Sequence, residues 1–258
     1  MKRKKWVRLD GGRKEHEGAI AELTKAIEAD PNNAAAWFDR AMAYAKQGDF
    51  DHAIADMDRA LQLEPGNAAL YLNRGALYFR NGETGKALAD CDEAVRLDPK
   101  DAMAYQNRGA IYASLGEYDK GIADCAMAIR RKPDFIEAYL SRARMYEEAK
   151  DPDHAIGDYT LVTRLDKKNF PAYYGRGRLF LQRGDYDRAL RDQTKALKIN
   201  PSSGLAYLQR SLAWGGKGRA DRQAADFNQA TKLDQRAVYA YITKHTKEEE
   251  QLAVSNEQ

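Results

Sequence analysis

A fixed period of 34 residues constrains this chain more than any other feature of its sequence. Prolines recur at one phase of that period, at Pro31, Pro65, Pro99, Pro133 and Pro201, and the two points of the lattice without proline hold Lys167 and Gln235. A period in the range of roughly 20 to 50 residues is typical of proteins built from similar units stacked in a row. With Ala34 as position 1, six complete repeats begin at residues 34, 68, 102, 136, 170 and 204.

Large and small residues recur at fixed positions and predict two helices in each repeat. Position 4 is always aromatic, at Trp37, Tyr71, Tyr105, Tyr139, Tyr173 and Tyr207, and position 8 is always Ala, Gly or Ser. Positions 4, 8 and 11, and then 20, 24 and 27, have the three- or four-residue spacing of an amphipathic helix. Five repeats have glycine at position 15, between the two stripes, where a left-handed backbone can end the first helix. In the first five repeats an acidic residue follows position 15 and is placed to cap the second helix.

This pattern closely resembles the tetratricopeptide repeat over roughly nine tenths of the chain. The Asn-Arg-Gly sequence at Asn73–Gly75 and Asn107–Gly109 resembles repeats of a type common in bacterial and photosynthetic-lineage proteins. The resemblance implies an all-α fold, a right-handed superhelical solenoid of antiparallel helix pairs, with six full repeats and partial units at both ends.

The repeat lattice also predicts the domain organisation. No Pro-, Gly- or Ser-rich linker interrupts it, so we expect one elongated domain. The solenoid is expected over residues 15–237, with full repeats at 34–67, 68–101, 102–135, 136–169, 170–203 and 204–237 after a half repeat at 15–33. Residues 1–14 are expected to be a basic N-terminal segment or a degenerate first helix, residues 238–254 a C-terminal capping helix, and residues 255–258 a frayed tail.

A charged pair recurs in every repeat and predicts an ion pair between its two helices. Position 7 is always arginine, at Arg40, Arg74, Arg108, Arg142, Arg176 and Arg210, and position 23 is always aspartate, at Asp56, Asp90, Asp124, Asp158, Asp192 and Asp226. In a hairpin that turns near position 15, residues whose positions sum to about 30 lie level with each other. The usual tetratricopeptide residue at position 7 is apolar, so a charge pair replaces a packing contact. We interpret these pairs as structural; the alternative is that the arginines also reach a ligand.

The fourth repeat departs from the pattern. Lys150 replaces the turn glycine, Val162 the small residue at position 27, and Lys167 the lattice proline. Pro152 and Pro171 fall at expected helix starts, where a missing N–H costs nothing. We interpret the departures as a local bend without a function of its own.

Composition and motifs argue against catalysis and against nucleic-acid binding. The net charge is +3, but residues 1–14 alone carry seven basic residues against Asp10, which leaves −3 for the rest of the chain. A solenoid without a basic stripe is not expected to bind a phosphate backbone. The four histidines are scattered and match no metal or catalytic motif, so no catalytic residue, metal or cofactor is predicted. Cys91 and Cys125 both lie at position 24 and are expected to be reduced core residues.

No apolar run is long enough for a membrane span or a signal peptide, so a cytoplasmic protein without a membrane partner is expected. In proteins that this chain resembles, positions 2, 5, 6, 9, 12 and 13 of the first helices face a concave groove. The candidate groove residues for binding a partner are Phe38, Asp39, Leu72, Asn73, Phe79, Arg80, Asn107, Leu140, Arg144, Tyr174, Arg178 and Leu208. The charges that fall at groove positions also include Glu147 and Glu148.

Apolar residues dominate these positions, which predicts a protein or peptide segment anchored by apolar side chains. The carboxylate-binding residues of chaperone-binding family members are matched only at Asn73. We therefore expect a non-enzymatic scaffold or adaptor. The alternative is a regulatory or substrate-docking arm of a larger enzyme or enzyme complex, and a self-assembling homo-oligomer is a third possibility.

Overall fold

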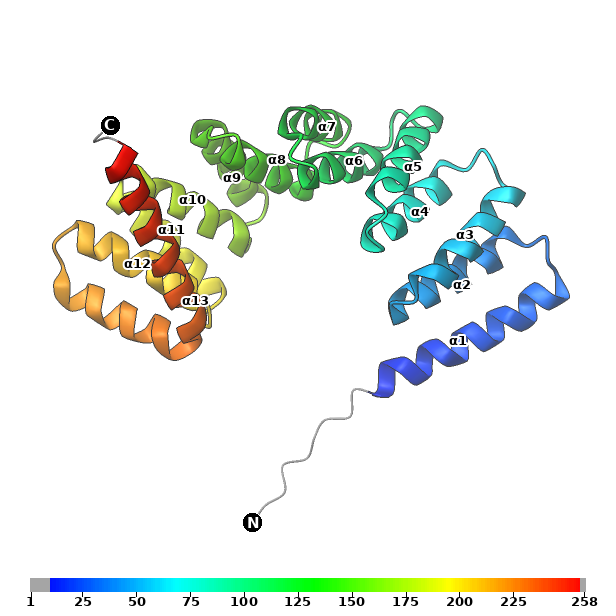
Figure 1. Cartoon of the computed structure of the whole chain (residues 1–258), viewed down its shortest axis with the longest axis horizontal. Coiled ribbons are helices and arrows are strands. Elements are labelled where there is room, and N and C mark those ends of the chain that lie inside the picture. The colour runs from blue at the N-terminus through cyan, green and yellow to red at the C-terminus, as the bar shows by residue number, and fades with distance from the viewer. Residues whose placement is uncertain (1–9, 256–258) are drawn as a thin grey trace, which may run out of the picture. The chain divides into compact units, whose positions relative to one another are not determined.

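The structure is a computed structural model that describes the backbone of residues 10–255 and the side chains of residues 17–243. Within the described part of the chain there are 13 helices and no strand (Figure 1). The all-helical repeat fold predicted from the sequence is confirmed. Most of the expected basic segment, including Lys2 to Lys5, and residues 256–258 of the expected tail lie outside the described residues.

The chain divides into two compact units, residues 1–133 and 134–258. The first unit contains α1 (Asp10–Ala29), α2 (Ala34–Gln47), α3 (Phe50–Leu63), α4 (Ala68–Arg80), α5 (Thr84–Leu97), α6 (Ala102–Ser114) and α7 (Tyr118–Arg131). The second contains α8 (Ile136–Glu148), α9 (Pro152–Leu165), α10 (Phe170–Gln182), α11 (Tyr186–Ile199), α12 (Gly204–Gly216) and α13 (Ala220–Ser255). From α2 onward, each repeat is a hairpin made of one even-numbered helix and the odd-numbered helix that follows it.

In five of the six hairpins the turn has the left-handed glycine that the sequence predicts. Gly48, Gly82, Gly116, Gly184 and Gly218 have positive φ angles of 69° to 84°. In the first repeat the amides of Gly48 and Asp49 donate to the carbonyls of Ala45 and Tyr44, which satisfies the end of α2. The side chain of Asp49 then accepts a hydrogen bond from the amide of His52 and caps α3. Turn and cap together fix where one helix stops and the next begins.

Small residues at positions 8, 20 and 27 let the two helices of a hairpin approach closely. Ala41, Ala53 and Ala60 are fully buried in the first repeat. In the second repeat a Cβ on Gly75 would lie 3.4 Å from Sγ of Cys91, which is already a packed contact. Cys91 and Cys125 are buried free thiols, and burial raises the pKa of Cys91 to about 12. Both act as small core residues, as predicted.

The last repeat ends in a helix that bends back on itself. The backbone of α13 leaves the helical conformation at Asp234 (φ −153°, ψ 81°), and the carboxylate of Asp234 accepts a hydrogen bond from the amide of Ala237 at 2.9 Å. After the bend, Val238 and Tyr241 pack against Leu205 and Leu208 of α12. No helix in the described residues is both long and apolar enough to cross a membrane.

Candidate functional site

The arginine at position 7 and the aspartate at position 23 form a two-pronged ion pair in all six repeats. The Nε and Nη2 atoms of each arginine donate to the two oxygens of the aspartate in the same repeat, at 2.7–2.9 Å. All six aspartates are buried, with exposures of 4–8%. The parallel pair of bonds is the strong geometry for a guanidinium and a carboxylate. These residues hold the two helices of a hairpin together.

A third bond of the same arginine, which sequence reasoning missed, reaches the preceding repeat. Nη1 of Arg74 donates to Asp58 at 2.7 Å, and Nη1 of Arg108 donates to Asp92 at 2.8 Å. Both acceptors lie at position 25, where threonines accept the equivalent bond from Arg40, Arg176 and Arg210. The hydrogen bonds to their two aspartates raise the pKa of Arg74 and of Arg108. In these five repeats the guanidinium bonds to the preceding unit as well as closing its own hairpin. In the sequence, the Thr or Asp at position 25 of the preceding unit indicates this bond.

The structure corrects the groove prediction at position 5. Leu72, Leu140 and Leu208 are 7%, 8% and 1% exposed, so these three candidates are not available to a partner. Leu72 packs with Ala104 and Ile111 of the next repeat. Leu208 is covered by α13, which occupies the groove face of α12. These three leucines are thus buried against neighbouring helices, which periodicity within one helix does not reveal, whereas Phe38 and Tyr174 at the same position line pockets.

In the first unit, three candidates meet in one hollow between α4 and α6. Phe79, Arg80 and Asn107 line a cavity of about 150 Å³ together with Ala76, Cys91, Ala110 and Ile111. Phe79 is 37% exposed, and the guanidinium of Arg80 lies over the ring of Phe50 at 4.8 Å.

The other candidates in the first unit lie outside this hollow. Phe38 lines a separate cavity of about 220 Å³, and Asp39 is exposed. Asn73 donates to the carbonyl of Ala69 at 2.7 Å, so part of its amide is engaged by its own helix.

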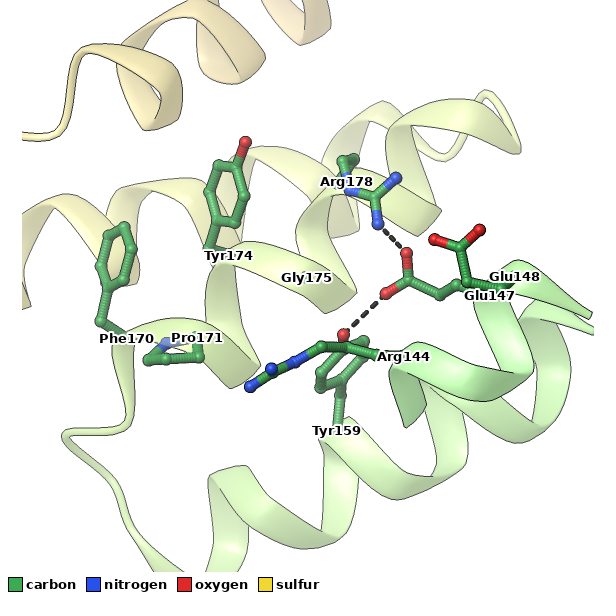
Figure 2. A pocket seen from close by; sticks show the side chains of 9 residues that line it. All are labelled: Arg144, Glu147, Glu148, Tyr159, Phe170, Pro171, Tyr174, Gly175 and Arg178. Carbon is green, nitrogen blue, oxygen red and sulfur yellow. Dashed lines mark hydrogen bonds and ion pairs between the residues drawn. The ribbon is translucent and has the colours of Figure 1, made fainter. Parts of the chain in front are cut away.

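In the second unit, a larger pocket brings together Arg144, Tyr174 and Arg178. It has a volume of about 400 Å³ and lies between α8 and α10, with α9 beneath (Figure 2). Its remaining lining residues are Glu147, Glu148, Tyr159, Phe170, Pro171 and Gly175. The volume is within the range of small-ligand and side-chain pockets. Groove positions of two consecutive first helices thus face one hollow.

The floor of this pocket is a buried polar network that the sequence analysis did not identify. The hydroxyl of Tyr159, a residue only 4% exposed, donates to one carboxylate oxygen of Glu147 at 2.6 Å. The other oxygen of Glu147 is ion-paired with Arg178 (Figure 2). Both oxygens are therefore occupied, and the three side chains fix one another.

Gly175 makes room for that floor. A Cβ at Gly175 would lie 2.6 Å from Cζ of Tyr159, so no larger residue fits while the ring stays in place. Tyr159 occupies position 24, which is Cys in the second and third repeats, and Gly175 occupies position 6, which is Asn in the same two repeats. The sequence signal for this contact was therefore a pair of opposite changes: a larger residue at position 24 and a smaller one at position 6 of the next repeat.

The electrostatics of the pocket leave one cation without a partner. Burial raises the pKa of Tyr159 to about 12, an effect partly offset by the positive charge of Arg144, and burial also raises the pKa of Tyr174 to about 12. Both hydroxyls stay protonated at neutral pH. Desolvation lowers the pKa of Arg178. Arg144 is exposed and makes no hydrogen bond or ion pair with any residue that the structure describes.

Among the described residues, no group of His, Cys, Asp and Glu side chains is arranged to hold a metal ion. The pocket residues donate and accept hydrogen bonds and offer apolar contact.

Models of the tetratricopeptide repeat match residues 6–68, 38–102, 102–135 and 170–203. The chain belongs to the tetratricopeptide repeat family, whose members generally mediate protein–protein interactions and whose repeats are typically non-enzymatic scaffolds.

Several solved structures share the fold. PilF of Pseudomonas aeruginosa superposes with a TM-score of 0.71 at 15% identity, over 82% of this chain and 97% of that one. A tetratricopeptide protein from Parabacteroides merdae gives 0.63 at 24% identity, over 84% and 80%. YrrB, described as having an unusual peptide-binding site, gives 0.63 at 19% identity, over 73% and 97%. No curated protein sequence matches the chain. Similarities this distant establish the fold alone.

Proposed function

We propose that the chain is a non-enzymatic adaptor that binds a segment of a partner protein on the inner faces of its first helices. The observation that carries the proposal is the pocket of the second unit, where positions 9, 12 and 13 of α8 and positions 5 and 9 of α10 line one hollow. Binding sites in proteins are concave, mostly apolar, and contain a few oriented polar groups. The pocket has this composition, because an aromatic and proline wall stands beside two guanidinium groups.

The surface in the first unit supports the same proposal. Phe79 exposes more than a third of its side chain next to the amide of Asn107, and Met103 on α6 is 55% exposed. Exposed apolar side chains next to an amide that can bond a peptide backbone are suited to an apolar-anchored segment. On α12 the equivalent face is occupied by α13, so the available surface is that of the preceding first helices.

Affinity capture from an extract of the source cells tests the proposal. The bait proteins are the wild type, Phe79→Glu, Arg144→Glu and the control Arg191→Glu, which makes the same charge change on the exposed surface of α11. We expect quantitative mass spectrometry to show proteins that the wild type and the control retain and that at least one groove variant loses. Equal capture by all four baits would remove these surfaces from the proposed function.

A further inference from the structure

Resting on the proposed function, we infer that the pocket of α8, α9 and α10 binds an extended peptide in which an acidic residue is adjacent to a large apolar residue. Arg144 binds the carboxylate, and the apolar side chain packs on the wall formed by Phe170, Pro171 and Tyr174.

The requirement for an acidic group follows from the charges in the pocket. Glu147 and Arg178 neutralise each other, and the second oxygen of Glu147 is held by Tyr159. Arg144 is left with free donors, which Figure 2 shows extended toward Pro171. Glu148 lies at the opposite end, beside Arg178, so it does not satisfy Arg144. A carboxylate is the natural partner for a guanidinium because their donors and acceptors match in pairs.

The requirement for an apolar neighbour follows from the wall next to Arg144. The rings of Phe170 and Tyr174 stack at 5.7 Å, and Pro171 lies between them and Arg144 (Figure 2). These residues are partly exposed, so their apolar faces are open to a ligand. A side chain of the size of leucine or phenylalanine packed there would be removed from water on one side by the rings and on the other by the stem of Arg144.

The pocket is preformed. Tyr159 is fixed by its hydrogen bond to Glu147, and its ring occupies the space where a Cβ on residue 175 would lie. A site whose polar residues are held by one another loses little entropy when a ligand binds. The departures of the fourth repeat include Tyr159, so they build this floor in addition to changing the turn.

Part of α13 is the obvious competitor for the same surface. Tyr241 lies close enough to Tyr174 and Arg178 to influence their pKa values, although it packs mainly against α12. Tyr241 is not among the residues that line the pocket, and Arg144 is exposed. We therefore assign the pocket to a separate peptide, and binding by the chain's own C-terminal segment becomes an outcome of the test.

Selection from a phage-displayed library of random dodecapeptides on the immobilised full chain tests the inference. We expect enriched sequences to contain Asp or Glu next to Leu, Ile, Phe or Trp. Fluorescence polarisation with one enriched peptide should show binding weakened about tenfold or more by Arg144→Glu and unchanged by Arg191→Glu. A peptide with Lys in place of the acidic residue should bind Arg144→Glu better than it binds the wild type.

Other outcomes overturn the inference. An enriched consensus without an acidic residue, or binding that Phe79→Glu abolishes and Arg144→Glu leaves intact, assigns recognition to another surface and leaves the adaptor proposal standing. If no peptide is enriched, the assignment of the pocket as a peptide-binding site is overturned. The capture experiment then tests the adaptor proposal separately. Enrichment only on a chain truncated after Asp234, of a peptide whose binding Arg144→Glu then weakens, shows that the C-terminal segment occupies the pocket in the full chain.

Discussion

The third and fourth repeats form the same hairpin but differ in the two residues of the turn between their helices. The third has Gly116 at position 15, with φ 75°, followed by Glu117, which makes no side-chain hydrogen bond to cap α7. The fourth has Lys150 in the same left-handed conformation, with φ 58°, followed by Asp151, which accepts a hydrogen bond from the amide of His154 and caps α9. One turn has the better backbone residue and the other has the better cap.

A second difference concerns position 24. Cys125 in the third repeat is a small residue packed under Gly109, whereas Tyr159 in the fourth reaches Gly175 of the next repeat and forms the floor of a pocket. The pair at positions 7 and 23 is the same in both. In both repeats the ion pair is kept while the turn residue and position 24 differ, and in the fourth repeat the residue at position 24 lines a pocket.

Removing one partner of the ion pair that recurs in every repeat should have the largest effect. Arg108→Leu leaves the buried Asp124 without its two bonds, so we expect a loss of about 3–5 kcal/mol in the free energy of unfolding. Asp124→Leu should cost less, because Arg108 keeps its bond to Asp92. Urea unfolding followed by circular dichroism measures both.

The double variant Arg108→Leu with Asp124→Leu should lose clearly less than the sum of the single losses. Strictly additive losses would refute the pairing. A loss of the same size for both single variants would contradict the role of Asp92.

The next largest effect should come from filling Gly175. Gly175→Asn places a Cβ 2.6 Å from Cζ of Tyr159 and should cost about 1–3 kcal/mol, because the ring must move away and break its hydrogen bond to Glu147. Adding Tyr159→Cys, which copies Cys91 and Asn107, should recover part of that loss. The control Gly157→Ala lies at an exposed helical position with no atom within 4 Å and should stabilise the protein by about 0.5–1 kcal/mol. A Gly175→Asn protein as stable as the wild type would show that the floor is not rigid.

The ion pairs and the pocket differ in how far they follow from the sequence. The ion pair can be predicted from the sequence of one hairpin, because its two positions, 7 and 23, sum to 30 and therefore lie level with each other. The contact from Arg108 to Asp92 cannot be predicted in this way, because it depends on how successive hairpins stack. Leu208 failed as a groove residue for the same reason, since α13 covers it. Tyr159 and Gly175 could be recognised in the sequence only by comparing repeats: a large residue replaces a small one at position 24, and a small residue replaces a larger one at position 6 of the next repeat.

The turns should respond to exchange of their left-handed residues. Lys150→Gly removes the strain of a non-glycine residue at positive φ and should stabilise the protein by roughly 0.5–1 kcal/mol. Gly116→Lys introduces the same strain and should destabilise the protein by a similar amount. Thermal unfolding of the two variants and the wild type measures this. Stability unchanged by either substitution would mean that the turn tolerates both conformations equally.

The caps should give the smallest effect and the one that depends on pH. Asp151→Glu should lower the unfolding temperature slightly and Glu117→Asp should raise it, because the shorter side chain reaches the amide three residues ahead. Hydrogen bonds from the backbone amide and then the ring of His154 lower the pKa of Asp151. A carboxylate with a lowered pKa stabilises the fold above its unfolded-state pKa of about 3.9, and this stabilisation is lost as the pH falls through the folded-state value. The difference between Asp151→Glu and the wild type should therefore be present at pH 7 and shrink toward pH 3. A difference that stays constant over this range would mean that the carboxylate's charge makes no contribution to the cap.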